Sequence, residues 1–238
     1  MQMKKFQQKP IVTTAQVGSP REFAAGVFCL ELSGAIGEDQ PISLARVRNT
    51  LAVHDFSHLH LKINSSGGDV REGQRIYEYL RSQPVPVSSE AVEKCLSMAM
   101  VLLAVGDFRL VSGEVTLLNH PVHRPRETLP QAVTAPILRA LADRLDEIDD
   151  RIAHVFAART GYPVEWFISE AKTEDHLSIA DAIQSGLLHE VTGLTQRVHP
   201  SWPDVVKALP RDVYLPRHLR SANYYCACRC VASLYGAS

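Results

Sequence analysis

The stretch HLHLKINSSGGDVREGQRIYEYL, residues 58–80, joins a strand pattern to a helix pattern through two adjacent glycines. Its first seven residues alternate, so leucine and isoleucine side chains share one face of a half-buried strand. We expect His58 and His60 to lie on the other face, in solvent. After the glycines, apolar side chains recur at helical spacing. This stretch therefore predicts a strand, a tight turn and a helix, which is a building block of α/β folds.

The same alternation of strands and helices continues in both directions along the chain. It predicts an α/β domain over residues 25–192, between an irregular segment at 1–24 and an extension of uncertain order at 193–238. Strands are predicted over 27–36, 58–64, 84–92 and 108–118, and helices over 41–52, after Val70, from Ser97 to Gly106, over 131–159 and from Ser178 to Gly186.

Composition narrows the classes of function. The chain has 238 residues, 45% of them hydrophobic, with 25 basic and 26 acidic side chains and a formal net charge of −1. No basic block suggests nucleic-acid binding. The start of the chain lacks the apolar core of a secretory signal, and the longest apolar run, 99–105, is too short to span a bilayer. These features predict a soluble, cytoplasmic protein that binds neither nucleic acid nor membrane.

The five cysteines predict no metal centre. Cys29 and Cys95 occur among apolar residues and are interpreted as small buried hydrophobes. Cys226, Cys228 and Cys230 form a C-x-C-x-C pattern rather than the C-x₂-C pairs of common zinc sites. We interpret this cluster as part of an exposed tail.

Two segments carry residues suited to acyl transfer. The glycines of NSSGGDV can present main-chain N–H groups to an oxyanion, although a Gly-Gly pair after a strand is more often only a turn. Ser97 stands at the predicted start of an apolar helix. It is either an N-cap or a nucleophile on a strand-to-helix turn, with the Met98 amide assisting the oxyanion.

The ordered set INSSGGDVREGQRIYEYL, CLSMAM, LLNHP, a long helix and EDHLSIADAIQSGLL resembles the proteolytic subunit of the caseinolytic (Clp) protease family and its phage-type relatives. The resemblance covers about 27–192. It implies the repeated β-β-α superhelix shared with crotonases, a long protruding handle helix over about 131–159, and a Ser-His-Asp triad inside stacked rings. Ser97 matches the family's nucleophile, and Gly68 and Met98 match its oxyanion-hole amides.

The match departs from the family at the histidine. The family has a histidine, one further residue and a proline, whereas LNHP places Asn119 in the histidine column and His120 in the next. A one-residue slip turns a strand side chain to the opposite face, and asparagine cannot accept the serine proton. A bulge could present His120, which we predict as the base. His123, beyond the proline, is the weaker candidate.

The acid position is also altered. The family's aspartate column holds Glu174, and Asp175 follows it; we favour Glu174, since glutamate can orient an imidazole as aspartate does. The alternative is a solvated acidic loop. Ser66 replaces the proline of the family's turn and removes no catalytic group.

The resemblance implies a serine endopeptidase that needs no cofactor and acts on peptides or unfolded proteins in an oligomeric, heptameric ring that can stack. ATP would act through an AAA+ unfoldase partner, because this chain has no P-loop motif. Two alternatives stay open: a catalytically inactive structural subunit with Asn119 in place of the base, and a crotonase-like acyl-CoA enzyme, for which no CoA-binding signature is present.

Overall fold

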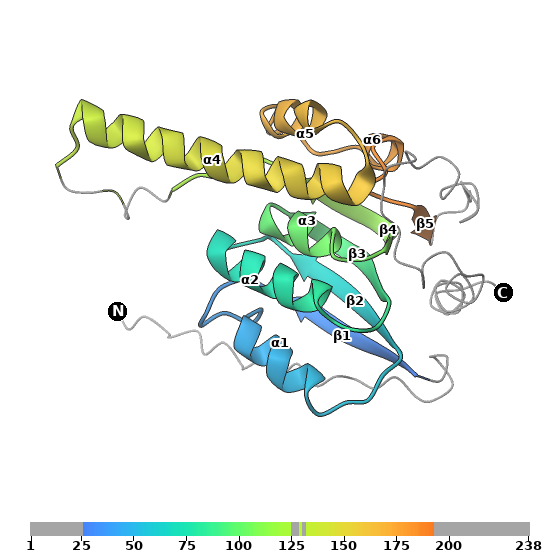
Figure 1. The fold of residues 1–238 in the computed structure, drawn as a ribbon. Coiled ribbons are helices and arrows are strands. Elements are labelled where there is room, and N and C mark those ends of the chain that lie inside the picture. Colours follow the sequence, from blue (N-terminus) through green and yellow to red (C-terminus); the bar gives the residue numbers. More distant parts are fainter. Residues whose placement is uncertain (1–25, 125–128, 130–131, 193–238) are drawn as a thin grey trace, which may run out of the picture.

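Strands and helices alternate along the chain, as the sequence pattern predicts (Figure 1). The computed structural model describes residues 26–124, 129 and 132–192. In chain order the elements are β1 (Val27–Ser33), α1 (Leu44–Leu51), β2 (His58–Ser65), α2 (Val70–Arg81), β3 (Val87–Leu96), α3 (Met98–Leu103), β4 (Phe108–Leu118), α4 (Ala135–Thr160), α5 (Val164–Ala171), α6 (Ile179–Gln184) and β5 (Glu190–Thr192). The predicted segment 1–24, the extension 193–238 and its three cysteines lie outside the described residues.

The five strands form one parallel sheet whose spatial order follows the chain order, β1-β2-β3-β4-β5. Helices α1, α2 and α3 lie side by side on one face of this sheet (Figure 1). The β3–β4 register shifts between Val92 and Lys94, which divides the pair into two successive segments. The predicted α/β class, in which helices connect parallel strands, is confirmed.

Local sequence signals explain where the helices begin and end. Asp69 caps α2 by accepting a hydrogen bond from the Glu72 amide at 2.7 Å. Ser178 caps α6 through the Asp181 amide, as the sequence predicts. Gly161 ends α4 in the left-handed conformation at φ +74°, which glycine adopts without the penalty of a side chain.

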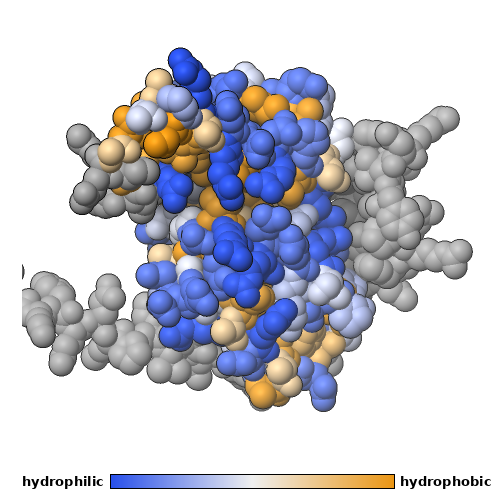
Figure 2. Space-filling model, turned by 60° about the vertical axis from the view of Figure 1, so that its left-hand side comes forward, coloured by the Kyte–Doolittle hydropathy of each residue, from blue (hydrophilic) through white to orange (hydrophobic). Residues whose placement is uncertain are grey.

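Helix α4 is the longest element, with 26 residues. Its first half extends beyond the rest of the described fold, as Figure 1 shows. Ile137 and Leu138 in that half are 41% and 51% exposed. Figure 2 shows apolar side chains gathered at this end of the molecule. Later in the helix, Ala153 and Phe156 join the buried core.

The structure corrects the prediction for His58 and His60. Their side chains are only 2% and 0% exposed, because they lie in a polar network inside the sheet rather than in solvent. Sequence alternation identified two faces of β2 but could not show that both are covered. Helix α5 and strand β5 were also missed, since each is short and has no regular apolar period.

Within the described residues, none of the helices combines the length and the hydrophobicity needed to cross a membrane.

Candidate active site

Ser97 lies on a sharp turn between β3 and α3. Its backbone has φ +56° and ψ −128°, a conformation that costs an ordinary L-residue free energy and that recurs at functional turns. The side chain is half-buried and makes no capping hydrogen bond to α3. The geometry therefore disfavours the N-cap alternative and leaves the hydroxyl available for other contacts.

The glycine pair packs directly against this turn. A Cβ atom at Gly67 would lie 2.7 Å from the Leu96 carbonyl oxygen and 2.8 Å from the Ser97 Cβ, so only glycine fits. Among the described residues, the amides of Gly68 and Met98 donate to no main-chain or side-chain acceptor. The Met98 amide belongs to the residue after Ser97, and the Gly68 amide to the residue after Gly67, so both are candidate donors to an oxyanion.

The other two segments of the predicted site approach Ser97 through their main chains. The Ser97 amide donates to the Leu118 carbonyl at 2.7 Å, and Leu118 is followed by Asn119 and His120. The Leu177 amide donates to the Leu117 carbonyl at 2.9 Å, which holds the loop carrying Glu174 and Asp175 beside the same strand. The parallel sheet thus gathers all three segments at one edge.

Asn119 and His120 point to different surroundings. Asn119 is 6% exposed and donates from Nδ2 to the Glu170 carboxylate of α5 at 2.9 Å. Burial raises the pKa of Glu170, and the Asn119 hydrogen bond acts in the opposite direction. The amide of Asn119 is therefore already used in anchoring α5.

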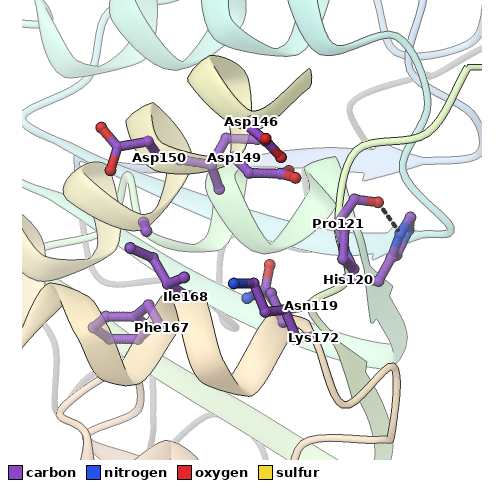
Figure 3. A pocket seen from close by; sticks show the side chains of 12 residues that line it. Asn119, His120, Pro121, Asp146, Asp149, Asp150, Phe167, Ile168 and Lys172 are labelled. Atoms are coloured by element: carbon purple, nitrogen blue, oxygen red, sulfur yellow. Dashed lines mark hydrogen bonds between the residues drawn. The ribbon is translucent and has the colours of Figure 1, made fainter. Parts of the chain in front are cut away.

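His120 is half-buried, and its Nδ1 lies 2.8 Å from the Pro121 carbonyl oxygen (Figure 3). A carbonyl can only accept, so Nδ1 carries the proton and the neutral ring keeps its lone pair on Nε2. The His123 ring lies next to it, with centroids 5.2 Å apart. No hydrogen bond joins His120 to Ser97 within the described residues.

Glu174 and Asp175 are both exposed. Glu174 has φ +53°, and its amide donates to the Ala171 carbonyl, while the Asp175 amide donates to Thr173 Oγ1. In the described part of the chain, neither carboxylate is hydrogen-bonded to His120. The structure brings their loop to the site without joining either side chain to the imidazole.

A cavity of about 490 Å³ opens beside the end of β4, between α4 and α5. Asn119, His120 and Pro121 line one side, and Figure 3 shows Asp146 and Asp149 opposite them. Asp149 Oδ1 accepts a hydrogen bond from the Val122 amide at 2.6 Å. No sequence pattern indicates these aspartates, because only the docking of α5 reveals which side of α4 lines the cavity.

The chain is similar to known proteins. The family model described as Clp protease matches residues 46–194. An ATP-dependent Clp protease proteolytic subunit from Pleurastrum terricola is 29% identical over 136 residues, which cover 56% of this chain and 67% of that protein. The protein of the same description from Liriodendron tulipifera is 31% identical over 141 residues, covering 56% and 65%.

The match of the family model spans more than half of the chain and includes both glycines, the Ser97 turn, the end of β4 and the acidic loop. The matched segments extend over about two thirds of the length of the two relatives. On this evidence, the chain belongs to the Clp protease family.

Proposed function

We propose that this chain is a serine endopeptidase in which Ser97 is the nucleophile. The observation that carries the proposal is the Ser97 turn: a positive φ, a hydroxyl that caps no helix, and the close packing of Gly67 against it. The amides of Met98 and Gly68 have no acceptors in the described residues. A strained strand-to-helix turn that exposes a serine is how hydrolases of other folds present their nucleophile. Membership of the Clp protease family supports peptide-bond hydrolysis as the reaction.

In the proposed reaction, Ser97 Oγ attacks a peptide carbonyl and His120 Nε2 takes its proton. The amides of Gly68 and Met98 donate to the oxyanion of the tetrahedral intermediate. His120 then gives the proton to the leaving amine, and water hydrolyses the acyl-enzyme by the same steps. The Pro121 carbonyl supports this role for His120, because it holds the proton on Nδ1.

The acid of the triad is proposed to be Glu174, with Asp175 as the second candidate. Either carboxylate would need a change of rotamer or loop position to reach His120, which is common in unliganded active sites. Because the Pro121 carbonyl already fixes the tautomer, we expect removal of either carboxylate to cost less activity than removal of His120.

The assembly and partners are proposed on the basis of the family. We infer that the chain forms a heptameric ring, which can stack on a second ring, and that it acts on peptides or unfolded proteins. An AAA+ unfoldase would supply ATP-driven unfolding, consistent with the words "ATP-dependent" in the descriptions of the relatives. We propose a cytoplasmic location and no metal or organic cofactor for the reaction itself.

A second candidate function is a structural subunit without catalysis. The specific observation behind it is Asn119, which fills the family's histidine column and is held by Glu170. In this case His120 Nε2 would never come within hydrogen-bond distance of Ser97, to which His120 has no hydrogen bond among the described residues.

Covalent labelling with a fluorophosphonate probe tests the proposal. The oligomeric fraction of the wild type should be labelled stoichiometrically, and Ser97→Ala should not be labelled. Ser169→Ala, at an exposed site on α5, is the matched control and should be labelled as the wild type is. Absence of labelling in a folded, assembled wild-type sample would exclude the peptidase.

Three further variants assign the base. His120→Ala should lower the labelling rate by about 10²-fold or more, whereas Asn119→Ala should leave a measurable rate even though it loosens α5. In the double variant Asn119→His/His120→Ala, recovered labelling would show that a histidine at position 119, and not at position 120, can act as the base for Ser97. That result would support the inactive-subunit alternative for the natural chain.

A further inference from the structure

From the cavity between α4, α5 and the end of β4 we infer that the enzyme prefers a lysine or arginine side chain next to the peptide bond that it cleaves. This inference rests on the proposed function and concerns its substrate. The cavity measures about 490 Å³, within the range of about 300–1,000 Å³ typical of ligand pockets.

The cavity adjoins the segment that follows the end of β4. Asn119, His120 and Pro121 form one wall, and they follow Leu118, whose carbonyl accepts the Ser97 amide at 2.7 Å. The proposed base is therefore itself a lining residue. A peptide held with its carbonyl at Ser97 would have the adjoining side chain within reach of this wall.

The lining suits a long side chain with a cationic end. Ile152 and Ile168, both half-buried, supply apolar surface for a methylene stem. Asp146 and Asp149 supply carboxylates on the side of α4, and Figure 3 shows both turned toward Pro121 and His120. Lysine and arginine combine such a stem with a charged tip that bonds to carboxylates.

More acidic than basic side chains line the cavity. Exposed Asp146 and half-buried Asp149 line the cavity together with Lys172 and His120, and none of the salt bridges found within the described residues joins either aspartate to a lysine or arginine. Asp150 instead lies 3.4 Å from exposed His154. Burial, and then the charge of Asp146, raise the pKa of Asp149, although the Val122 amide, His120 and Lys172 act in the opposite direction.

A substrate cation would relieve this imbalance. It would gain one or two charge-assisted hydrogen bonds in a partly enclosed site, which are stronger than those between neutral groups. A norleucine side chain has almost the same shape as lysine and could fill the apolar part, but would leave the carboxylates without a partner. The preference is therefore a matter of charge rather than size.

Phosphonate probes that carry lysine or norleucine at the position next to the reactive phosphorus test the inference. Both react with a serine nucleophile, so the ratio of their labelling rates measures the preference at Ser97. We expect the lysine probe to react about 10-fold faster, which corresponds to about 1.4 kcal/mol. Asp146→Asn should reduce this ratio severalfold, and Asp146→Asn/Asp149→Asn should bring it close to one.

Asp143→Asn is the matched control, because Asp143 lies on α4, is exposed and does not line the cavity. It should keep the wild-type ratio. Equal rates for the two probes, or an unchanged ratio in Asp146→Asn, would overturn the inference while fluorophosphonate labelling of Ser97 still upheld the peptidase.

A binding measurement tests the cationic preference of the cavity independently of the proposed peptidase activity. In Ser97→Ala, fluorescence anisotropy should show tighter binding of a fluorescent peptide with one central lysine than of the same peptide with norleucine, and Asp146→Asn should remove the difference. This readout needs no turnover, so it holds even if the wild type fails to label. Equal binding of the two peptides would count against the cationic cavity.

Discussion

At the scale of single residues, the Ser97 turn depends on a close main-chain approach. Gly67 has φ +86° and leaves no room for a Cβ against Leu96 and Ser97, while Gly68 has φ +149° and packs on the main chain of Ile36. The Met98 side chain, 3% exposed, packs on Gly73 of α2. Glycines that follow β2 and a glycine on α2 thus limit where Ser97, between β3 and α3, can lie.

Gly67→Ala should displace the Ser97 turn. The added Cβ would lie 2.7 Å from the Leu96 carbonyl oxygen, in addition to the left-handed backbone strain of about 1–2 kcal/mol. We expect a loss of about 3 kcal/mol or more in the free energy of unfolding and a large loss of Ser97 labelling. Urea denaturation and the fluorophosphonate assay measure the two effects.

Gly113→Ala is the control for this substitution. Gly113 has φ +71°, so it shares the backbone strain, but an added Cβ would meet nothing within 4 Å. It should lose only the strain energy and should label normally. Equal losses in both variants would show that contact with Ser97 is not what Gly67 provides.

At the scale of elements, a polar network crosses the middle of the sheet. His58 Nε2 of β2 lies 2.8 Å from Ser88 Oγ of β3, and His60 contacts the same hydroxyl at 2.9 Å. His60 also pairs with Glu90 at 3.0 Å. Ser112 of β4 donates to the second oxygen of Glu90, so the network links three adjacent strands.

The network makes stability depend on pH. Burial, and then the neighbouring His60, lower the pKa of His58 from 6.5 to about 4. The unfolded chain therefore binds this proton more readily than the folded chain, and the free energy of unfolding should fall as the pH drops from about 6.5 to about 4. His58 alone corresponds to at most about 3 kcal/mol of this loss.

Two other buried groups act in the same direction. Burial, together with Arg109 and Arg159, lowers the pKa of His189 well below its ordinary value. Burial by itself would raise the pKa of Glu90, but the hydrogen bond and charge of His60 hold it below its ordinary value, so its contribution is lost as the pH falls through that lowered value.

His58→Gln isolates the contribution of His58. Its urea midpoint should fall less steeply than that of the wild type between pH 6.5 and 4.5, since glutamine does not titrate. His154→Gln, at an exposed site on α4, is the control and should follow the wild-type profile. A His58→Gln profile parallel to the wild type would contradict the role of His58.

At the scale of the whole molecule, α4 has two different ends. Its last turns pack on the core through Ala153 and Phe156, whereas Ile137 and Leu138 near its start are exposed. Apolar side chains gathered on a projecting element are typical of an interface with another chain. This agrees with the proposed ring assembly, in which the helix would act as the handle between rings.

Leu138→Glu should therefore weaken self-association. A charge placed in an apolar interface loses its hydration without gaining a partner, so we expect a shift to smaller species in sedimentation velocity while the circular dichroism spectrum is retained. Ala158→Glu, exposed near the other end of α4, should assemble as the wild type does. An unchanged size distribution for Leu138→Glu would exclude this end of α4 as an interface.

Much of the fold could be predicted from the sequence, because it depends on short-range signals. Alternation over 58–64, the cap at Ser178 and the apolar run after Ser97 each locate an element within a few residues. Helix α5 could not be predicted in this way. Its single buried residue, Phe167, becomes part of the core only through contact with α4.

The candidate site, like the fold, could be predicted from the sequence only in part. The order of the glycine pair, Ser97 and LNHP along the chain was enough to indicate the family, and the sheet then gathers them. The sequence left open whether the side chain of Asn119 or that of His120 points toward Ser97, because neighbouring strand residues face opposite sides and a bulge changes the register. The structure engages Asn119 with Glu170 and leaves the Nε2 lone pair of His120 available.

By itself, then, the sequence determined the α/β class, the succession of elements and the residue types of an acyl-transfer site, since these follow from local periodicity, caps and turns. Only the tertiary structure decided that His58 and His60 are buried, that Asp146 and Asp149 line the cavity, and that Gly67 packs against the Ser97 turn. The physical reason is that burial and proximity depend on contacts between segments far apart in the chain, and no pattern within a single segment encodes its partner.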